Sequence, residues 1–150
     1  MRAVIQRVKD AKLFIEEKIY SSIELGLIIL VAFEDTDTTE DLDYIAKKVS
    51  KLRIFDDSEG VMNLSIENIM GEIMVVSQFT LYASTKKGNR PSYIKAAKPD
   101  IAVPLYNSFI DLLNISTSAK ISTGVFGADM KISFTNFGPV TIIIDSKLKE

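Results

Sequence analysis

Two short polar segments border apolar runs in this chain, which contains neither histidine nor cysteine. The first segment is Ser77-Gln78-Phe79-Thr80, and the second is Asn136-Phe137-Gly138-Pro139-Val140-Thr141. Without imidazole or thiol, the chain lacks the common proton shuttle, the thiolate nucleophile and the ligands of a His/Cys zinc site. Chemistry must therefore come from carboxylates, Lys, Tyr, Ser/Thr, backbone dipoles or the substrate itself, and we expect neither a metal nor an organic cofactor.

The first segment allows two interpretations. Its polar residues are either the exposed end of a core strand or part of a site. In the second case, the backbone N–H groups of Phe79 and Thr80, the Gln78 amide and the hydroxyls of Ser77 and Thr80 form a donor-rich cradle for a carbonyl oxygen. The Thr80 hydroxyl is also a potential nucleophile, but it needs a base, and no histidine is available.

The composition is that of one globular domain spanning residues 1–150. Hydrophobic residues make up 47% and charged residues 25% of the chain, as in ordinary globular proteins. The first ten residues lack the apolar stretch of a signal peptide, and the longest apolar run, residues 27–33, is too short to span a membrane. We therefore expect a soluble protein. The absence of cysteine excludes disulfides and is compatible with the cytoplasmic location that we expect.

A run of cations follows the first segment and consists of Lys86, Lys87, Arg90, Lys95 and Lys98. Such a run is usually a solvated surface. Next to a candidate site, it can also contact the phosphates of a nucleic acid without reading sequence. The net charge of −2 argues against a generally basic surface, so any such contact must be local.

Apolar spacing along the chain predicts an α+β fold with a mixed or barrel-like sheet and two main helices. Strands are expected at residues 4–8, 13–15, 19–23, 27–33, 73–82, 120–126, 130–135 and 140–145, and a turn at residues 56–60. Helices are expected at about residues 39–53 and 100–113. Thr38 and Asp41 provide a capping-box start for the first helix. Pro91 suits the start of a further short helix, and Pro104 the first turn of the helix at 100–113.

Five segments taken together resemble the D-aminoacyl-tRNA deacylase family. They are MRAVIQRV at residues 1–8, SQFTLYA at 77–83, KKGNRPS at 86–92, TGVFGADM at 123–130 and NFGPVT at 136–141. The resemblance spans nearly the whole chain, and the ordered set is far more specific than any single segment.

The resemblance implies a homodimer of small α+β subunits, with the active site at the subunit interface, that removes D-amino acids and also glycine from mischarged tRNA. Ser77, Gln78, Phe79 and Thr80 then correspond to the catalytic motif. Gly138 and Pro139, with Met130, correspond to the residues of chiral selection. An isolated Gly-Pro is an ordinary turn, whereas in the family this bond is cis and enters the partner's pocket to exclude L-amino acids.

Lys86, Lys87 and Arg90 are, on this interpretation, candidates for tRNA binding. The chain departs from the common family pattern at Phe137, where many relatives carry an acidic residue, and at Ser84, where Asp is frequent. The resemblance implies an ester hydrolase, in which either Thr80 attacks or the tRNA ribose 2′-OH helps to activate water. A non-catalytic RNA-binding module and a purely structural homodimer are the alternatives.

Overall fold

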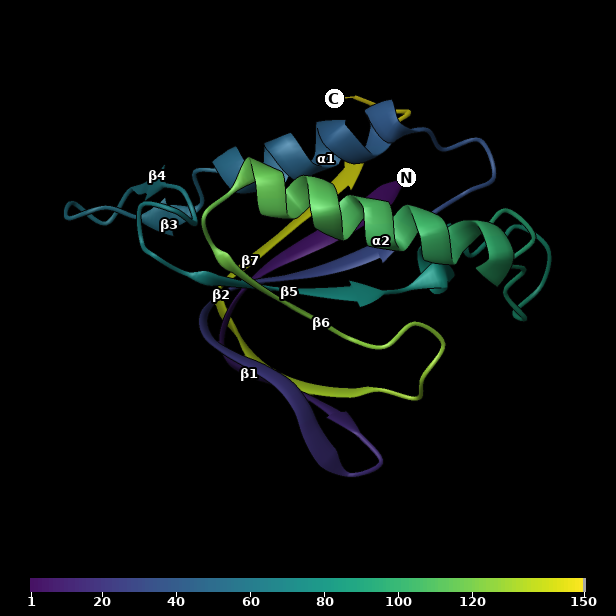
Figure 1. Ribbon diagram of the computed structural model, residues 1–150, viewed down its shortest axis with the longest axis horizontal. Helices are drawn as coiled ribbons and strands as arrows, with labels where there is room; N and C mark the ends of the chain where they lie inside the picture. The colour runs from purple at the N-terminus through teal and green to yellow at the C-terminus, as the bar shows by residue number, and fades with distance from the viewer. Residues whose placement is uncertain (150) are drawn as a thin grey trace.

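A five-stranded mixed sheet is the scaffold of the protein (Figure 1). The computed structural model describes residues 1–149. The sheet has the order β6-β5-β2-β1-β7. Its strands are β1 (Arg2–Ile15), β2 (Lys18–Ala32), β5 (Glu72–Ser77), β6 (Lys120–Thr123) and β7 (Lys131–Asp145). The strand β1 runs antiparallel to β2 and β7, whereas β5 runs parallel to β2 and β6. Long-range strand pairing thus brings the two ends of the chain together.

Two helices, α1 (Thr39–Lys51) and α2 (Pro99–Ser116), lie on the same face of the sheet (Figure 1). A short hairpin of β3 (Phe55–Asp56) and β4 (Met62–Leu64) and the 3₁₀ helix η1 (Phe79–Tyr82) complete the elements. The predicted α+β class, mixed sheet and two main helices are confirmed. Within residues 1–149 the sheet has two edges, β6 and β7, so it curves without closing into a barrel.

Several expected strands are segments of longer ones. The predicted strands at 4–8 and 13–15 form the single strand β1, and those at 19–23 and 27–33 form β2. The gap expected between residues 8 and 13 is a bulge, where the pairing of β1 with β7 shifts register between Lys9 and Lys12. Asp10 has a φ of 52° in this bulge. Such a bulge changes which face a side chain takes while the strand continues. The predicted strands at 130–135 and 140–145 likewise form β7.

Other expectations were wrong in detail. The strand predicted at 73–82 ends at Ser77, and the one at 120–126 ends at Thr123. Pro91 begins no helix, because backbone hydrogen bonds between Ser84 and Ser92 of 2.8 and 2.9 Å close residues 84–92 into a loop. Pro104 lies inside α2 rather than in its first turn, since the helix starts earlier, at Pro99. The turn at 56–60 joins β3 to β4.

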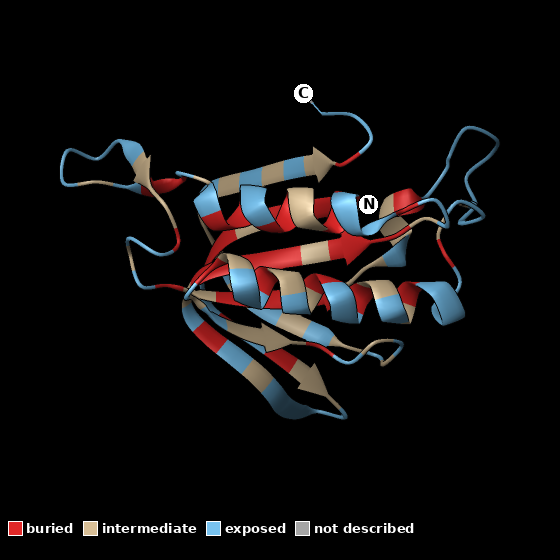
Figure 2. Cartoon of the chain, turned by 45° about the horizontal axis from the view of Figure 1, so that its top comes forward, coloured by how far each residue is buried: buried red, intermediate tan, exposed pale blue. Residues whose placement is uncertain are grey.

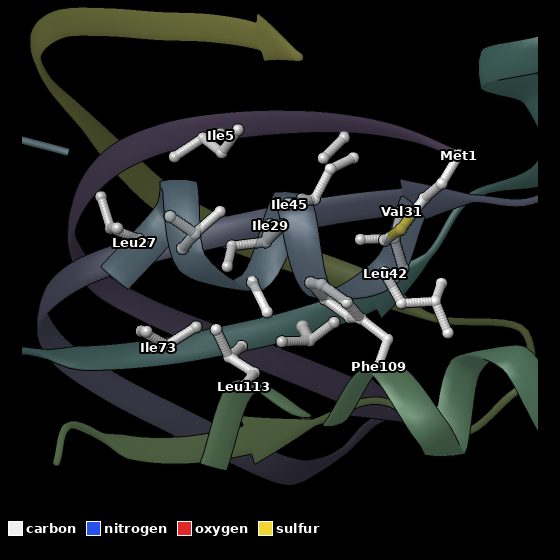
Figure 3. Close-up of a cluster of buried hydrophobic side chains, with 14 of the residues drawn as sticks. Met1, Ile5, Leu27, Ile29, Val31, Leu42, Ile45, Ile73, Phe109 and Leu113 are labelled. Atoms are coloured by element: carbon white, nitrogen blue, oxygen red, sulfur yellow. The ribbon is translucent and has the colours of Figure 1, made fainter. Parts of the chain in front are cut away.

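The main core lies between the sheet and the helices. Buried residues form bands on the helix faces that look toward the strands (Figure 2). Figure 3 shows Phe109 and Leu113 of α2 and Ile45 of α1 around side chains of the sheet such as Ile29, and all four are fully buried. Each apolar side chain of this size contributes about 1.5–3 kcal/mol when fully buried. This packing holds both helices at fixed positions over the strands.

The start of α1 follows the expected capping chemistry. The Thr38 N–H donates to Asp41 Oδ2 at 2.9 Å, and Lys147 Nζ donates to the same oxygen at 2.7 Å. Burial raises the pKa of Asp41, but the hydrogen bonds from Lys147 and Thr38 outweigh burial and hold this pKa well below its usual value of 3.8. Asp41 therefore joins α1 to the segment after β7 as an ionised carboxylate.

We expect Asp41→Asn to lower the free energy of unfolding by about 1–3 kcal/mol at pH 7, because the substitution removes a charged hydrogen-bond acceptor. A lowered pKa stabilises the fold above the unfolded-state pKa, and this contribution falls as the pH falls. The difference between wild type and variant should therefore shrink at pH 3, as measured by urea unfolding. Asp43→Asn, which removes an exposed pair with Lys47, is the control and should cost much less. Equal losses from both variants at pH 7 would contradict this account.

Candidate active site

A cavity of about 310 Å³ opens where the carboxyl ends of β2 and β5 meet the start of α2. The walls come from the end of β2, the end of β5, the start of α2, the segment 126–130 and the beginning of β7. The lining residues are Val31, Ala32, Phe33, Val76, Ser77, Gln78, Phe79, Ala97, Ala102, Phe126, Gly127, Ala128, Asp129, Met130 and Ile132. Among these, Asp129 carries the one ionisable side chain. The cavity is mainly apolar, with Ser77 and Gln78 at the end of β5 and Asp129 just before β7 as its polar side chains.

The segment 77–80 leaves β5 at this cavity. The Gln78 N–H donates to the Val31 carbonyl at 2.7 Å, which extends the pairing of β2 with β5 by one residue. The chain then turns into η1, where the Leu81 N–H donates to the Gln78 carbonyl at 3.1 Å. The N–H groups at the start of a helix have no partner within it. Within residues 1–149, the Phe79 and Thr80 N–H groups donate to no acceptor, as a donor cradle requires.

The side chains of the same segment divide into two groups. Ser77, Gln78 and Phe79 line the cavity, whereas Thr80 does not. The Gln78 amide donates a hydrogen bond to the Thr80 hydroxyl, and both side chains are partly buried. Three of the four expected catalytic residues therefore border the cavity. The fourth, Thr80, lies behind Gln78 and is hydrogen-bonded to it.

Tyr106 fixes the cavity wall from α2, a role that the sequence analysis missed. Its hydroxyl donates to the Val75 carbonyl at 2.8 Å, and its ring contacts the Phe126 ring edge-to-face with centroids 6.0 Å apart. Burial raises the pKa of this hydroxyl far above its usual value, despite the opposing effect of the Gly124 N–H. It therefore remains a hydrogen-bond donor. A polar aromatic in the apolar stripe of a helix was the available signal.

Gly138 and Pro139 lie on β7, away from the cavity of their own chain. The bond between them is cis, as the resemblance implied, and both residues are exposed. Two strands, β2 and β1, separate β5 from β7. The first residues of β7 nevertheless reach the cavity at Ile132, and Gly138 lies six residues further along the strand, roughly 20 Å away at about 3.3 Å per residue. Met130, in contrast, lines the cavity, so the three residues expected to act in chiral selection are not together within one chain.

A buried guanidinium holds the Gly138–Pro139 turn. Arg7 is 4% exposed, and its Nε donates to the Phe137 carbonyl at 2.8 Å. Its Nη1 donates to the Ile54 carbonyl at 2.7 Å and to Asp56 at 3.2 Å. This role of Arg7 was not predicted from the sequence. The signal was a cation on the inward face of a strand otherwise apolar on that face, since charged residues are rarely buried without partners.

Phe137, where the chain departs from the common family pattern, also places its ring against Arg7. The Lys9 ammonium lies 3.8 Å from the ring centroid, and the Arg7 guanidinium lies 4.8 Å from it. Cations within about 6 Å of an aromatic face are attracted to it. An aromatic residue here therefore makes favourable contacts with two cations.

Lys86, Lys87 and Arg90 are exposed in the loop that Ser84 and Ser92 close. The loop follows η1 and precedes α2, so it lies at the end of the sheet where the cavity opens (Figure 1).

Residues 1–149 contain neither a cluster of metal-ligating side chains nor a membrane-spanning helix. No group of three or more His, Cys, Asp or Glu side chains in this range could hold a metal ion. No helix in this range is long and apolar enough to cross a membrane.

Comparisons with known proteins agree over the full chain. The family model of D-Tyr-tRNA(Tyr) deacylase matches residues 4–145. D-aminoacyl-tRNA deacylases of Flavobacterium psychrophilum and Parabacteroides distasonis are 59% and 58% identical to the chain over 150 residues, which cover all of both sequences. A solved structure titled "c-Myc DNA Unwinding Element Binding Protein" is 35% identical, with a TM-score of 0.91, and the alignment covers 97% of this chain and 98% of that one.

A second solved structure, titled a probable eukaryotic D-amino acid tRNA deacylase, is 19% identical. Its TM-score is 0.80, and the alignment covers 95% of this chain and 97% of that one. At this identity the likeness concerns the fold alone.

We expect Gly138→Ala to displace Arg7 and to destabilise the protein by about 1–3 kcal/mol. An added Cβ would lie 2.6 Å from Arg7 Nη2 and 2.9 Å from Val140 Cγ2, and the φ of 131° disfavours any side chain. Gly88→Ala is the matched control, because Gly88 also has a positive φ, 74°, but no atom within 4 Å of the added Cβ. Thermal unfolding measures both variants. Equal losses would mean that contact with Arg7 does not restrict position 138.

Proposed function

Because this chain belongs to the D-Tyr-tRNA(Tyr) deacylase family, we propose that it hydrolyses the ester linking a D-amino acid to the terminal adenosine of tRNA. The enzyme class, a D-aminoacyl-tRNA deacylase acting on an ester bond, follows from that membership. The observation that carries the proposal is the match with D-aminoacyl-tRNA deacylases at 55–59% identity over their entire length. A mainly apolar cavity with unpaired backbone donors at its mouth suits an aminoacyl ester.

Ester hydrolysis passes through a tetrahedral intermediate that carries an oxyanion. The N–H groups of Phe79 and Thr80 are preorganised at the start of η1, beside the Ser77 and Gln78 side chains. Preorganised donors stabilise the charge that develops on the carbonyl oxygen, and removal of one such donor typically costs a factor of about 100–1,000 in rate. We assign these two N–H groups to the oxyanion.

The tRNA itself supplies the activating group in this proposal. The Thr80 hydroxyl is hydrogen-bonded to Gln78 and lies off the cavity lining, which disfavours it as the nucleophile. The chain has no histidine that could act as its base. We therefore propose that the free 2′-OH of the terminal ribose helps to activate the attacking water, while the protein positions the ester.

Chiral selection is proposed to act between two subunits of a homodimer. Gly138 and Pro139 are exposed and lie outside the lining of their own chain's cavity, six residues or more along β7 from Ile132, so they suit insertion into the cavity of a partner. Their backbone would occupy the space that an L side chain needs, opposite Met130. Selection by exclusion would admit D-amino acids and also glycine, so glycyl-tRNA is a second proposed substrate.

Lys86, Lys87 and Arg90 are proposed to contact phosphates of the tRNA near its 3′ end. Exposed cations on a loop beside the cavity can neutralise phosphates without reading sequence. A cytoplasmic location, where tRNA is charged and used, accompanies this proposal.

Purified protein should deacylate D-Tyr-tRNA and leave L-Tyr-tRNA intact, because an excluding filter rejects the L side chain before the ester reaches the donors. The assay follows release of labelled amino acid from each enantiomer, with a no-enzyme control for spontaneous hydrolysis. Equal hydrolysis of both enantiomers would defeat the chiral filter. Binding of tRNA without hydrolysis of either enantiomer would instead indicate a non-catalytic RNA-binding module.

Substrate-assisted chemistry makes a separate prediction about Thr80. Thr80→Ala should retain measurable activity, whereas a substrate whose terminal ribose carries hydrogen in place of the 2′-OH should not be hydrolysed above background. Single-turnover rates on both substrates measure this, with Thr80→Ser as the control that keeps the hydroxyl. Loss of activity in Thr80→Ala, retention in Thr80→Ser and hydrolysis of the 2′-deoxy substrate would together identify Thr80 as the nucleophile.

A further inference from the structure

Two aromatic rings are exposed at the mouth of the cavity. Phe79, which lines the cavity, is 55% exposed, and Tyr93 of the following loop is 38% exposed. Their ring centroids are 5.1 Å apart, with an angle of 77° between the planes. In an edge-to-face pair, one ring offers only its edge, so each ring keeps at least one face that the other does not cover. The pair therefore presents open aromatic faces beside the cavity.

Tyr93 is held between two backbone anchors. On one side, Ser84 and Ser92 exchange two backbone hydrogen bonds of 2.8 and 2.9 Å. On the other, the Ala96 N–H donates to the Tyr93 carbonyl at 2.9 Å, and the Ala97 N–H donates to Phe33 of the cavity wall at 2.8 Å. A ring on such a segment is preorganised, so little further ordering is needed when a ligand binds.

The charge around the pair favours an anionic ligand. Residues 84–98 contain five cations and no Asp or Glu, although the whole chain has a net charge of −2. Flat aromatic faces combined with surrounding cations are how proteins bind single-stranded nucleic acid, since every base has a face that can stack. A protein partner is disfavoured because Lys is depleted at protein–protein interfaces, whereas four of these five cations are Lys.

We propose that Phe79 and Tyr93 form a stacking platform for an unpaired base of the tRNA 3′ end, adjacent to the terminal adenosine in the cavity. The proposal rests on the proposed function and deepens it, because it assigns a binding surface to the part of the tRNA that lies outside the cavity. The phosphates on either side of the stacked base then lie near the cations of residues 84–98. The platform recognises single-stranded RNA by shape and charge, without reading the identity of the base.

The test compares two substrates that carry the same D-aminoacyl ester. One is full-length D-Tyr-tRNA, and the other is D-tyrosyl-adenosine, which lacks every nucleotide beyond the terminal one. In Tyr93→Leu, the KM for the tRNA should rise about 10-fold relative to that for the adenosine ester, whereas Tyr93→Phe should restore the wild-type ratio. Tyr44→Leu is the matched control, because Tyr44 is also an aromatic flanked by lysines, Lys48 and Lys149, but lies on α1.

A direct readout accompanies the kinetics. 2-Aminopurine replaces the base next to the terminal adenosine of uncharged tRNA, and its fluorescence should be quenched by wild type and Tyr93→Phe but not by Tyr93→Leu. Thermal unfolding checks that each variant folds. An equal rise in KM for both substrates, an unchanged KM for the tRNA, or equal quenching by Tyr93→Leu would overturn the platform. Failure of the proposed function looks different, because wild type would then hydrolyse neither substrate.

Discussion

The parallel pairing of β2 with β5 determines where the site forms. The two strands approach so closely at one end that a Cβ on Gly26 would lie 1.8 Å from the Glu72 carbonyl oxygen, so only glycine fits there. From Gly26 opposite Glu72, the register runs without a shift to Val31 opposite Ser77. The Gln78 N–H then continues the ladder onto the Val31 carbonyl. The pairing of β2 with β5 therefore fixes the position of the backbone N–H groups at the start of η1.

Under the proposed function, this arrangement would allow a chain without imidazole or thiol to hydrolyse an ester. The donors at the start of η1 are part of the backbone, so they carry no side-chain freedom and need no particular protonation state. Tyr106 supports them from α2 through the Val75 carbonyl, and burial keeps its hydroxyl protonated. Rigid dipoles that need no reorganisation are effective at stabilising developing charge. In the proposed chemistry, the protein therefore contributes fixed hydrogen-bond donors and does not transfer protons.

The positions of helices and strands were predictable from the sequence, but the lengths of the strands were not. The two main helices followed from apolar spacing, and Thr38 and Asp41 marked the start of α1, because these signals act over a few residues. The length of β1 did not follow, since the bulge near Asp10 changes the periodicity while the partners β2 and β7 keep the strand intact. The loop around Pro91 was also beyond local signals, because the bonds between Ser84 and Ser92 decide it.

The residues of the candidate site were predictable from the sequence, but their arrangement in space was not. The motifs gave Ser77 to Phe79 and Met130, which the fold brings to one cavity. The separation of Gly138 from that cavity depends on the path of β7 along the sheet, which leaves the cavity after Ile132 and which no local pattern encodes. The contacts of Arg7 with Ile54 and Phe137 depend on the same long-range pairing.

That separation has a genetic consequence. If the Gly138–Pro139 turn serves the cavity of a partner, the two functions of one polypeptide belong to two different active sites. A subunit with a damaged cavity and a subunit with a damaged turn then form a mixed dimer in which both defects meet in one site. The other site combines an intact cavity with an intact turn. Two alleles that are each defective, one in hydrolysis and the other in selectivity, would complement one another, and the mixed dimer would keep half of the sites with full activity and selectivity.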